Sequence, residues 1–185
     1  MQARTFEITG PLELLPRKFG DERGYFVETF NLKTAISLGV AETPWVQDNQ
    51  SFSALPYTLR GMHFQLQPMA QAKIVRVLNG SIFDAVVDLR PESSHFGKWL
   101  SVVLRADQMN QLYVPEGFAH GFLTLEPDVQ VAYKVSNFYS TAHDRSLNWA
   151  DAEVGIDWPL PSGVKPILSD KDRSAPDLKK LKSDL

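Results

Sequence analysis

The chain has no cysteine among its 185 residues. This absence excludes a disulfide framework, a thiolate metal site and a cysteine nucleophile. No apolar run approaches the roughly 18 residues of a membrane-spanning helix, so we expect no membrane segment. The first residues, 1–5, lack the apolar stretch of a secretory signal, and the expected compartment is therefore the cytoplasm.

The chain also lacks a surplus of basic side chains. Its 19 lysines and arginines stand against 22 aspartates and glutamates, a formal net charge of −3. Nucleic-acid-binding domains usually carry a basic surplus, so we expect no nucleic-acid partner. Any anion must then be bound by a local basic cluster. A hydrophobic share of 43% is ordinary for a globular protein, and the length suits one domain, 1–185.

Helical periodicity is scarce, and short apolar stretches alternate with glycine, proline and asparagine. In the stretch 81–89, apolar residues alternate with Asp84 and Asp88, which is the period of a strand. Asn79-Gly80, just before it, predicts a two-residue hairpin. Further strands are expected at 24–30, 46–52, 72–78, 99–104, 111–114, 121–125 and 129–135. The predicted fold is all-β, a cupin or double-sheet jelly-roll barrel with few short helices.

Two segments favour other structure. Asn31 is placed to cap a short helix that ends at Gly39. The charged stretch 175–185 suits a surface helix or a frayed tail. Three prolines lie between residues 157 and 166, so we expect the segment from about 157 to 185 to wrap the surface of the single domain.

The residues best suited to chemistry lie in two stretches. The first, 58–73, contains His63, which can take a proton, together with Arg60 and Lys73, which can hold anionic oxygens. The second, 114–122, contains His120 and is expected to form a facing wall of the same pocket. A histidine on an apolar strand is as readily a satisfied core group as a catalyst, and it is these cationic neighbours that favour the functional interpretation.

A buried cationic cluster needs a negative partner. Lysine is seldom buried unpaired, and several cations near one cavity are costly unless an anion or a carboxylate offsets them. Asp84 is expected on the strand beside Lys73. It would serve there either as a carboxylate of the cluster or simply as the buried partner of the lysine.

A metal centre is the alternative for two histidines in a barrel. Zinc and iron sites want three or four ligands, commonly imidazole and carboxylate. Metal-binding cupins have a His-x-His motif, but here Gln65 occupies its second position and no glutamate follows within reach. Only His63 and His120 remain, so we expect no metal and no other cofactor, and a metal-dependent oxygenase is disfavoured.

Longer motifs are spread over almost the whole chain, at 19–28, 47–51, 59–65, 87–90, 96–99, 114–122, 133–134, 156–159 and 168–172. In these motifs the chain resembles the dTDP-4-dehydrorhamnose 3,5-epimerases, which are metal-free, cupin-fold enzymes of dTDP-L-rhamnose synthesis. The resemblance implies an isomerase that converts dTDP-4-dehydro-6-deoxy-D-glucose to dTDP-4-dehydro-L-rhamnose. It also implies a homodimer in which contacts to this dTDP-4-keto-6-deoxyhexose cross the interface.

The implied chemistry is proton transfer next to a ketone. The hydrogens on C3 and C5 are both α to the C4 carbonyl, so removing either gives an enolate. By the resemblance, His63 is the base, Tyr133 is the acid on the opposite face, and Lys73 holds the C4 oxygen. A reference pKa of about 6.5 suits imidazole as a general base near neutral pH. Asp172 is implied as the carboxylate that orients His63, with Asp170 as the alternative.

The resemblance also implies a set of substrate contacts. Arg23 and Arg60 match contacts to the diphosphate and nucleotide, for which the arginine fork is suited. The family pattern has a longer acid where this chain has Asp144, which makes that contact the least secure. The other implied binding residues, in the nucleotide and sugar subsites, are Phe19, Glu28, Gln47, Asn49, His120, Tyr139 and Lys171.

Two other functions share part of this set. A sister enzyme that inverts only C3 or only C5 of a related 4-keto sugar nucleotide would use the same base, acid and lysine. A non-catalytic cupin that binds sugar nucleotides would keep the arginines but would need neither His63 nor Tyr133. The joint presence of these two residues therefore favours an enzyme.

Overall fold

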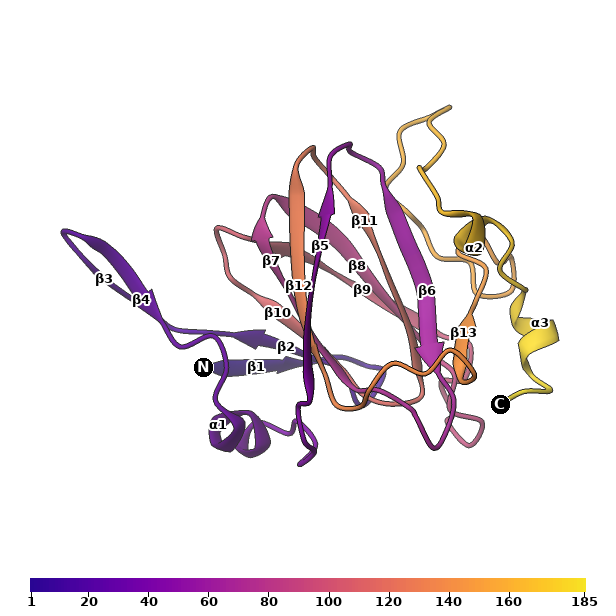
Figure 1. Ribbon diagram of the computed structural model, residues 1–185, viewed down its shortest axis with the longest axis horizontal. Coiled ribbons are helices and arrows are strands. Elements are labelled where there is room, and N and C mark those ends of the chain that lie inside the picture. Colours follow the sequence, from indigo (N-terminus) through magenta and orange to yellow (C-terminus); the bar gives the residue numbers. More distant parts are fainter.

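The computed structural model describes residues 1–185, and most of its regular structure is strand. Two large sheets face each other (Figure 1). The six-stranded sheet has the order β1 (Gln2–Thr5), β2 (Leu12–Leu15), β10 (Gln111–Val114), β7 (Lys73–Asn79), β12 (Val129–Val135), β5 (Gln47–Ser53). The five-stranded sheet has the order β13 (Asp144–Ser146), β6 (Leu59–Gln65), β11 (Phe118–Thr124), β8 (Ser81–Asp88), β9 (Trp99–Arg105). The predicted double-sheet, cupin-like barrel is confirmed.

A third, two-stranded sheet projects away from the barrel. It consists of β3 (Lys18–Asp21) and β4 (Gly24–Val27), paired antiparallel, and forms the arm at the left of Figure 1. The strand predicted at 24–30 therefore ends early. Phe26 is 70% exposed and Tyr25 is 59% exposed, so these aromatic side chains have little apolar contact within a single chain.

Helices are few and short, as predicted: α1 (Leu32–Ser37), α2 (Asp170–Arg173) and α3 (Leu178–Leu181). Asn31 caps α1, and its side-chain oxygen accepts a hydrogen bond from the Thr34 amide at 3.2 Å. None of the three is long or apolar enough to cross a bilayer.

The predicted hairpin at Asn79-Gly80 is wrong. β7 pairs with β10 and β12, whereas β8 pairs with β9 and β11, so the chain changes sheet at Gly80. Gly80 has a φ of +81°, and a Cβ there would lie 2.8 Å from the Val129 side chain. The dipeptide signals a sharp turn, but the direction of the turn depends on which sheet buries the following strand.

β8 is buried on both faces. Ile82 and Val86 point into the barrel with other apolar side chains, and the alternation places Asp84 on this inner face. Ala85 and Val87 point outward, into an apolar layer that includes residues of the C-terminal segment. Leu178 and Leu181 of α3 belong to that layer and are almost fully buried. The end of the chain is therefore a docked helix rather than a frayed tail.

Candidate active site

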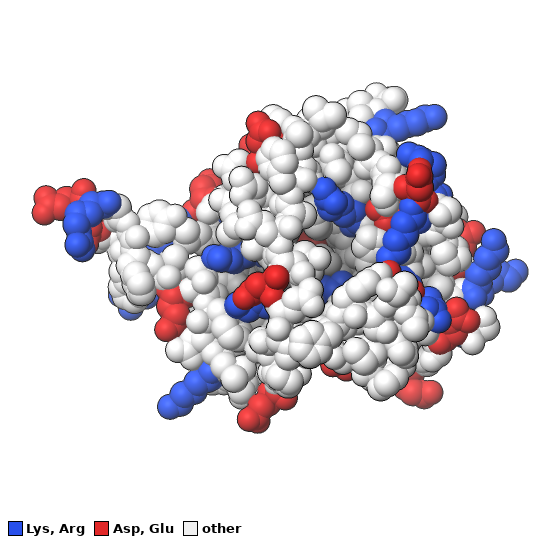
Figure 2. Space-filling view, in the orientation of Figure 1, with Lys and Arg blue, Asp and Glu red and all other residues white.

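A cavity of about 570 Å³ lies between the two sheets. On the face shown in Figure 2 the molecule is hollowed, and basic side chains lie around and inside the hollow. Most of the predicted site residues line this one cavity: Gln47, Asn49, Arg60, His63, Lys73, His120, Tyr133, Tyr139, Asp144, Lys171 and Asp172. Three others, Phe19, Arg23 and Glu28, do not.

An irregularity in β6 brings two of these side chains to the inner face. Residues three apart in a regular strand point to opposite faces, yet Arg60 and His63 both line the cavity. The β6–β11 register shifts between these positions. At Gly61, where φ is +125°, a Cβ would lie 2.6 Å from the Gly121 Cα. Only glycine fits this approach of two backbones, which places the guanidinium and the imidazole side by side.

His63 pairs with Asp172 across 109 residues of sequence. Its Nε2 lies 2.6 Å from Asp172 Oδ1, so Nδ1 is the ring nitrogen free to act on a ligand. Ser169 caps α2 and donates from Oγ to Asp172 Oδ2 at 2.8 Å. Burial raises the pKa of Asp172, but hydrogen bonds from His63 and Ser169 and the charge of His63 outweigh it, and the net pKa is lowered. Asp170 instead pairs with Arg173 in solvent.

The sequence predicted that His120 faces His63 from the opposite wall of the pocket, and this prediction is wrong. β11 is the neighbour of β6 in the same sheet, and His120 lies directly opposite His63 in the register. The strand of Asp84 is not the neighbour of the strand of Lys73 that the sequence predicted, because β7 and β8 belong to different sheets. Asp84 Oδ1 lies 2.6 Å from His120 Nε2 instead. The second error follows from the change of sheet at Gly80. The charge of Asp84 nevertheless acts on Lys73, as expected for a carboxylate of the cluster.

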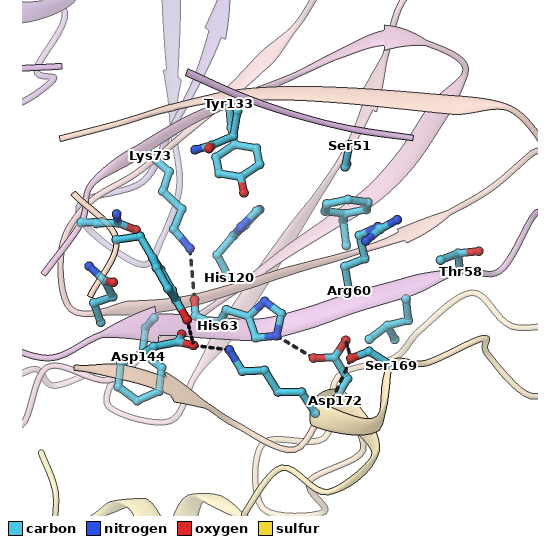
Figure 3. Close-up of a pocket in the computed structure, with 18 of the residues that line it drawn as sticks. Ser51, Thr58, Arg60, His63, Lys73, His120, Tyr133, Asp144, Ser169 and Asp172 are labelled. Atoms are coloured by element: carbon cyan, nitrogen blue, oxygen red, sulfur yellow. Dashed lines mark hydrogen bonds and ion pairs between the residues drawn. The ribbon is translucent and has the colours of Figure 1, made fainter. Parts of the chain in front are cut away.

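Lys73 and Tyr133 enter the cavity from the facing, six-stranded sheet (Figure 3). Lys73 is buried, and its Nζ donates to the carbonyl oxygen of His63 at 3.2 Å. Burial lowers the pKa of Lys73 to about 8, against the opposing charges of Asp84 and Asp144. Burial likewise raises the pKa of the Tyr133 phenol, which the charge of Arg60 partly offsets.

The comparisons with known proteins agree on one family. A family model described as dTDP-4-dehydrorhamnose 3,5-epimerase matches residues 5–180. The chain belongs to this family. A member from Sinorhizobium fredii is 50% identical over 163 residues, 88% of this chain and 82% of that protein. The motif resemblance is thereby confirmed, and the family is one of isomerases.

Solved structures of epimerases in this family share the fold. The Bacillus anthracis dTDP-4-dehydrorhamnose 3,5-epimerase with TDP and PPi bound has a TM-score of 0.91 at 47% identity, covering 96% of this chain and 99% of that one. The Legionella pneumophila dTDP-6-deoxy-D-glucose-3,5-epimerase was solved in complex with dTDP-4-keto-L-rhamnose. It has a TM-score of 0.92 at 37% identity, covering 99% of this chain and 95% of that one.

The rim of the cavity in this member of the epimerase family is a linked polar group. Tyr139 donates from its hydroxyl to Asp144 Oδ2 at 3.1 Å, and Lys171 forms an ion pair with the same carboxylate. The group joins the loop before β13 to α2. Arg60 stands at another part of the rim, where its guanidinium donates to the Phe52 carbonyl oxygen at 3.0 Å.

Phe19 and Arg23 lie on the projecting arm, and Glu28 just follows it, so none of them reaches the cavity of its own chain. Arg23 pairs with Asp21 at 2.6 Å and is exposed. Glu28 accepts a hydrogen bond from the side chain of Asn31. These positions require a second chain if the residues are to meet a ligand in the cavity.

Several residues that line the cavity were not predicted as site residues from the sequence, chiefly Ser51, Thr58, Ile167 and Ser169. Of these, Ser169 had a readable signal, since Ser-x-x-Asp is the pattern of a capping box. Thr58 and Ile167 form a parallel β-bridge between segments that are distant in sequence, and no local sequence pattern predicts such a contact. No group of three or more histidine, aspartate or glutamate side chains is placed to hold a metal ion.

Proposed function

We propose that the chain catalyses the 3,5-epimerisation of dTDP-4-dehydro-6-deoxy-D-glucose to dTDP-4-dehydro-L-rhamnose. The observation that carries this proposal is that His63 and Tyr133 project into one cavity from opposing sheets. Inversion of a carbon requires a base on one face of the sugar and an acid on the other. Family membership supplies the substrate class, a nucleotide-linked 4-keto-6-deoxyhexose.

In the first half of the reaction, His63 removes the hydrogen on C3 or C5. Because Nε2 is held by Asp172, the proton goes to Nδ1, and the carboxylate stabilises the imidazolium that forms. The electrons of the broken C–H bond move to the C4 oxygen. Lys73 stabilises the resulting enolate, and a preorganised donor at such an oxygen is worth roughly 3–4 kcal/mol.

In the second half, Tyr133 donates its phenolic proton to the same carbon from the opposite face. Its partial burial raises the pKa of the phenol, so the proton stays on the oxygen until the enolate is present. The configuration at this carbon is then inverted. His63 then releases its proton to solvent and Tyr133 regains one, and repetition at the second α-carbon gives the doubly inverted product.

The remaining cavity residues bind the nucleotide part of the substrate in this proposal. Arg60 holds the diphosphate, since guanidinium donates parallel hydrogen bonds to phosphate oxygens. Gln47 and Asn49 lie on β5 at the nucleotide end, and the Gln47 side chain donates to Asn49 at 2.7 Å. Tyr139, which is largely exposed at the rim, packs against the thymine.

Proton NMR of dTDP-4-keto-6-deoxyglucose with the protein in D₂O tests the proposal. We expect deuterium at both C3 and C5 and accumulation of the L-rhamno product. Deuterium at one carbon alone would identify a mono-epimerase, which could use the same base, acid and lysine. No exchange at either carbon would leave only a binding protein and overturn the proposal.

We further propose that the enzyme needs no metal or other cofactor and works in the cytoplasm. The candidate metal ligands form two separate histidine–carboxylate pairs, His63 with Asp172 and His120 with Asp84. A zinc or iron site takes three or four ligands around one ion. Activity should survive prolonged chelation. Stoichiometric metal whose removal abolishes turnover would refute this part of the proposal.

We also propose a homodimer in which the arm, residues 18–27, reaches the neighbouring subunit. Phe19, Tyr25 and Phe26 are all more than half exposed on this arm, and a large apolar surface of this kind is typical of an interface. A dimer would also carry Arg23 and Glu28 to the partner's nucleotide site. Light scattering at micromolar concentration should give about twice the monomer mass, and a fully active monomer would contradict this.

A further inference from the structure

The cavity holds a second histidine–carboxylate pair that the mechanism above leaves without a role. Asp84 is 0% exposed, and its Oδ1 lies 2.6 Å from His120 Nε2. Its other oxygen, Oδ2, is buried without any hydrogen-bond partner. Leaving a buried carboxylate oxygen unpaired is costly, so this charge must be offset by something nearby.

The strands place this pair directly beside the proposed base. On β11, His120 lies opposite His63 of β6 on one side and opposite Val86 of β8 on the other. Asp84 is two residues from Val86, so it occupies the same inner face as a diagonal neighbour of His120. The imidazole reaches the cavity while the carboxylate behind it is sealed from solvent.

The two pairs differ in a way that matters chemically. Asp172 has both oxygens hydrogen-bonded, one to His63 and one to Ser169. Asp84 has one oxygen on His120 and one free. The first carboxylate is therefore saturated by its partners, whereas the second has negative charge left to act on another group.

The group on which that charge acts is Lys73. Among the charges that favour the ammonium form of Lys73, Asp84 comes first and Asp144 second, and Lys171 opposes them. The titratable and charged groups around Lys73 come from several elements. Asp84 of β8 lies behind the cavity wall, and the lining of the cavity supplies the others: Arg60 and His63 from β6, His120 from β11, Tyr133 from β12, Tyr139 from the loop before β13, Asp144 from β13, and Lys171 and Asp172 from α2.

We propose that Asp84 is a positioning residue that organises a two-donor site for the enolate oxygen. It holds His120 through Nε2 as an imidazolium, so that Nδ1–H is the donor directed at the C4 oxygen, and its free oxygen balances the charge of Lys73. This inference rests on the proposed function and adds a second donor to it. No proton leaves His120 or Lys73 in this step; the proton from carbon goes to His63.

The geometry explains why one carboxylate serves both donors. A buried carboxylate against Nε2 stabilises the imidazolium form of His120, in which Nδ1 also carries a proton and can donate it in a hydrogen bond. An unscreened negative charge in a low-dielectric interior also acts strongly on a nearby ammonium. Without Asp84, the His120 ring loses its orientation and Lys73 loses the largest charge that offsets its burial. Both donors to the enolate would weaken together.

Asp84→Asn tests the proposal, with Asp88→Asn as the matched control. Asp88 lies on the same strand and the same inner face, is equally buried, and pairs with Arg90 and Ser93 rather than with cavity residues. We expect Asp84→Asn to lower kcat by roughly 10–100-fold, the usual effect of removing an orienting partner, with KM within about twofold. Asp88→Asn should lose stability but keep the parental kcat.

A second measurement needs no substrate and so does not depend on the proposed function. In protein labelled with [ε-¹³C]lysine, the Lys73 signal should titrate at about pH 8 in the parent. In Asp84→Asn it should titrate at lower pH, and in Asp88→Asn it should be unchanged. The alkaline limb of the kcat profile of Asp84→Asn should move in the same direction.

Long-range ¹H–¹⁵N NMR of ¹⁵N-histidine protein completes the test, with His120→Gln used to assign the signal. We expect protons on both ring nitrogens of His120 in the parent, and a ring with a proton on Nε2 alone would refute the second donor. The proposal is overturned if Asp84→Asn keeps both the parental Lys73 titration and the parental kcat, or if Asp88→Asn changes them equally. Should Asp84→Asn not fold, His120→Gln keeps the carboxylate and removes one donor, and parental kcat in that variant would refute the two-donor site.

Discussion

At the residue scale, the proposed mechanism divides the work between side chains on opposing sheets. His63 is tied to Asp172 and is part-exposed to the cavity, whereas Tyr133 faces it from the other sheet. Neither side chain alone can invert a carbon, because removal and return of the proton from one face restores the original centre. The two halves can therefore be separated by substitution.

His63→Asn should abolish both deuterium exchange and epimerisation, because no enolate forms without the base. Tyr133→Phe keeps the ring and removes the hydroxyl, so the enolate should still form and be reprotonated by His63 on the original face. Exchange then survives while inversion falls by about 10²–10⁴-fold. NMR in D₂O follows both events in one sample. Inversion of both centres at the parental rate by Tyr133→Phe would show that this tyrosine is not the acid.

Lys73→Met should abolish activity and yet stabilise the fold at neutral pH. The pKa of Lys73 is lowered by burial to about 8, so below pH 8 the folded protein holds a buried ammonium that the unfolded chain hydrates. This costs the folded state on the order of 1–3 kcal/mol. Between pH 8 and the ordinary lysine pKa of 10.5, the unfolded chain binds the proton and the folded protein does not, so the free energy of unfolding of the parent rises with pH.

The advantage of Lys73→Met should therefore be full below pH 8 and disappear as the pH approaches 10.5. Urea unfolding at several pH values measures it, and Lys165→Met, at an exposed position, serves as the control with no expected gain. Equal stability of Lys73→Met and the parent at pH 7 would mean that the ammonium is fully compensated in the folded state.

At the element scale, α2 is a single turn that delivers the carboxylate to the base. Ser169 begins it, with its Oγ accepting from the Asp172 amide and donating to the Asp172 carboxylate. Behind α2, the helix α3 is anchored by Leu178 and Leu181 and by Asp151, whose Oδ2 accepts the Leu178 amide at 2.7 Å. The wrapping segment thus holds the carboxylate partner of the proposed base against the barrel.

Ser169→Ala should lower kcat several-fold while leaving KM close to the parental value. The cap is worth about 1 kcal/mol to the turn, and its loss frees one Asp172 oxygen and so loosens the partner of His63. The acid-side limb of the kcat profile should move to higher pH, because a hydrogen bond that lowers the pKa of Asp172 is gone. Ser169→Thr keeps the hydroxyl and should restore both values; failure to do so would point to packing instead.

At the scale of the whole molecule, the proposed nucleotide site is incomplete in one chain. Arg23 and Glu28, both expected to contact the nucleotide, lie on or next to an arm that points away from the barrel (Figure 1). If the arm enters a second subunit, each site combines His63 of one chain with Arg23 of the other. This arrangement makes activity a property of the dimer.

Mixing two inactive variants tests the shared site. In a heterodimer of His63→Asn and Arg23→Ala, one site carries both substitutions and the other carries neither. Equal co-refolding should therefore restore about a quarter of the parental activity, because half of a random mixture of dimers is mixed and half of its sites are intact. The separately refolded variants, combined afterwards, are the control. No recovery on co-refolding would place Arg23 in its own chain's site or outside any site.

Local pattern in the sequence was sufficient for the strand periodicity of 81–89 and the Asn31 cap, and the family motifs named the residues that we propose as base, acid and lysine. These properties depend on neighbours within a few residues or on motifs that stay contiguous. The C-terminal motif even singled out Asp172, although Asp170 remained an alternative until the structure placed one carboxylate on His63 and the other in solvent.

Only the tertiary structure decided which strands share a sheet. The turn at Asn79-Gly80 has the same local chemistry whether the chain folds back on β7 or crosses to the facing sheet, and β8 is apolar enough for either position. The crossing places β8 beside β11, so the Asp84 carboxylate pairs with His120. The pairing of β11 with β6 places His120 opposite His63. Periodicity determines which face a side chain takes, but the partner it meets there is determined by long-range packing of the whole barrel.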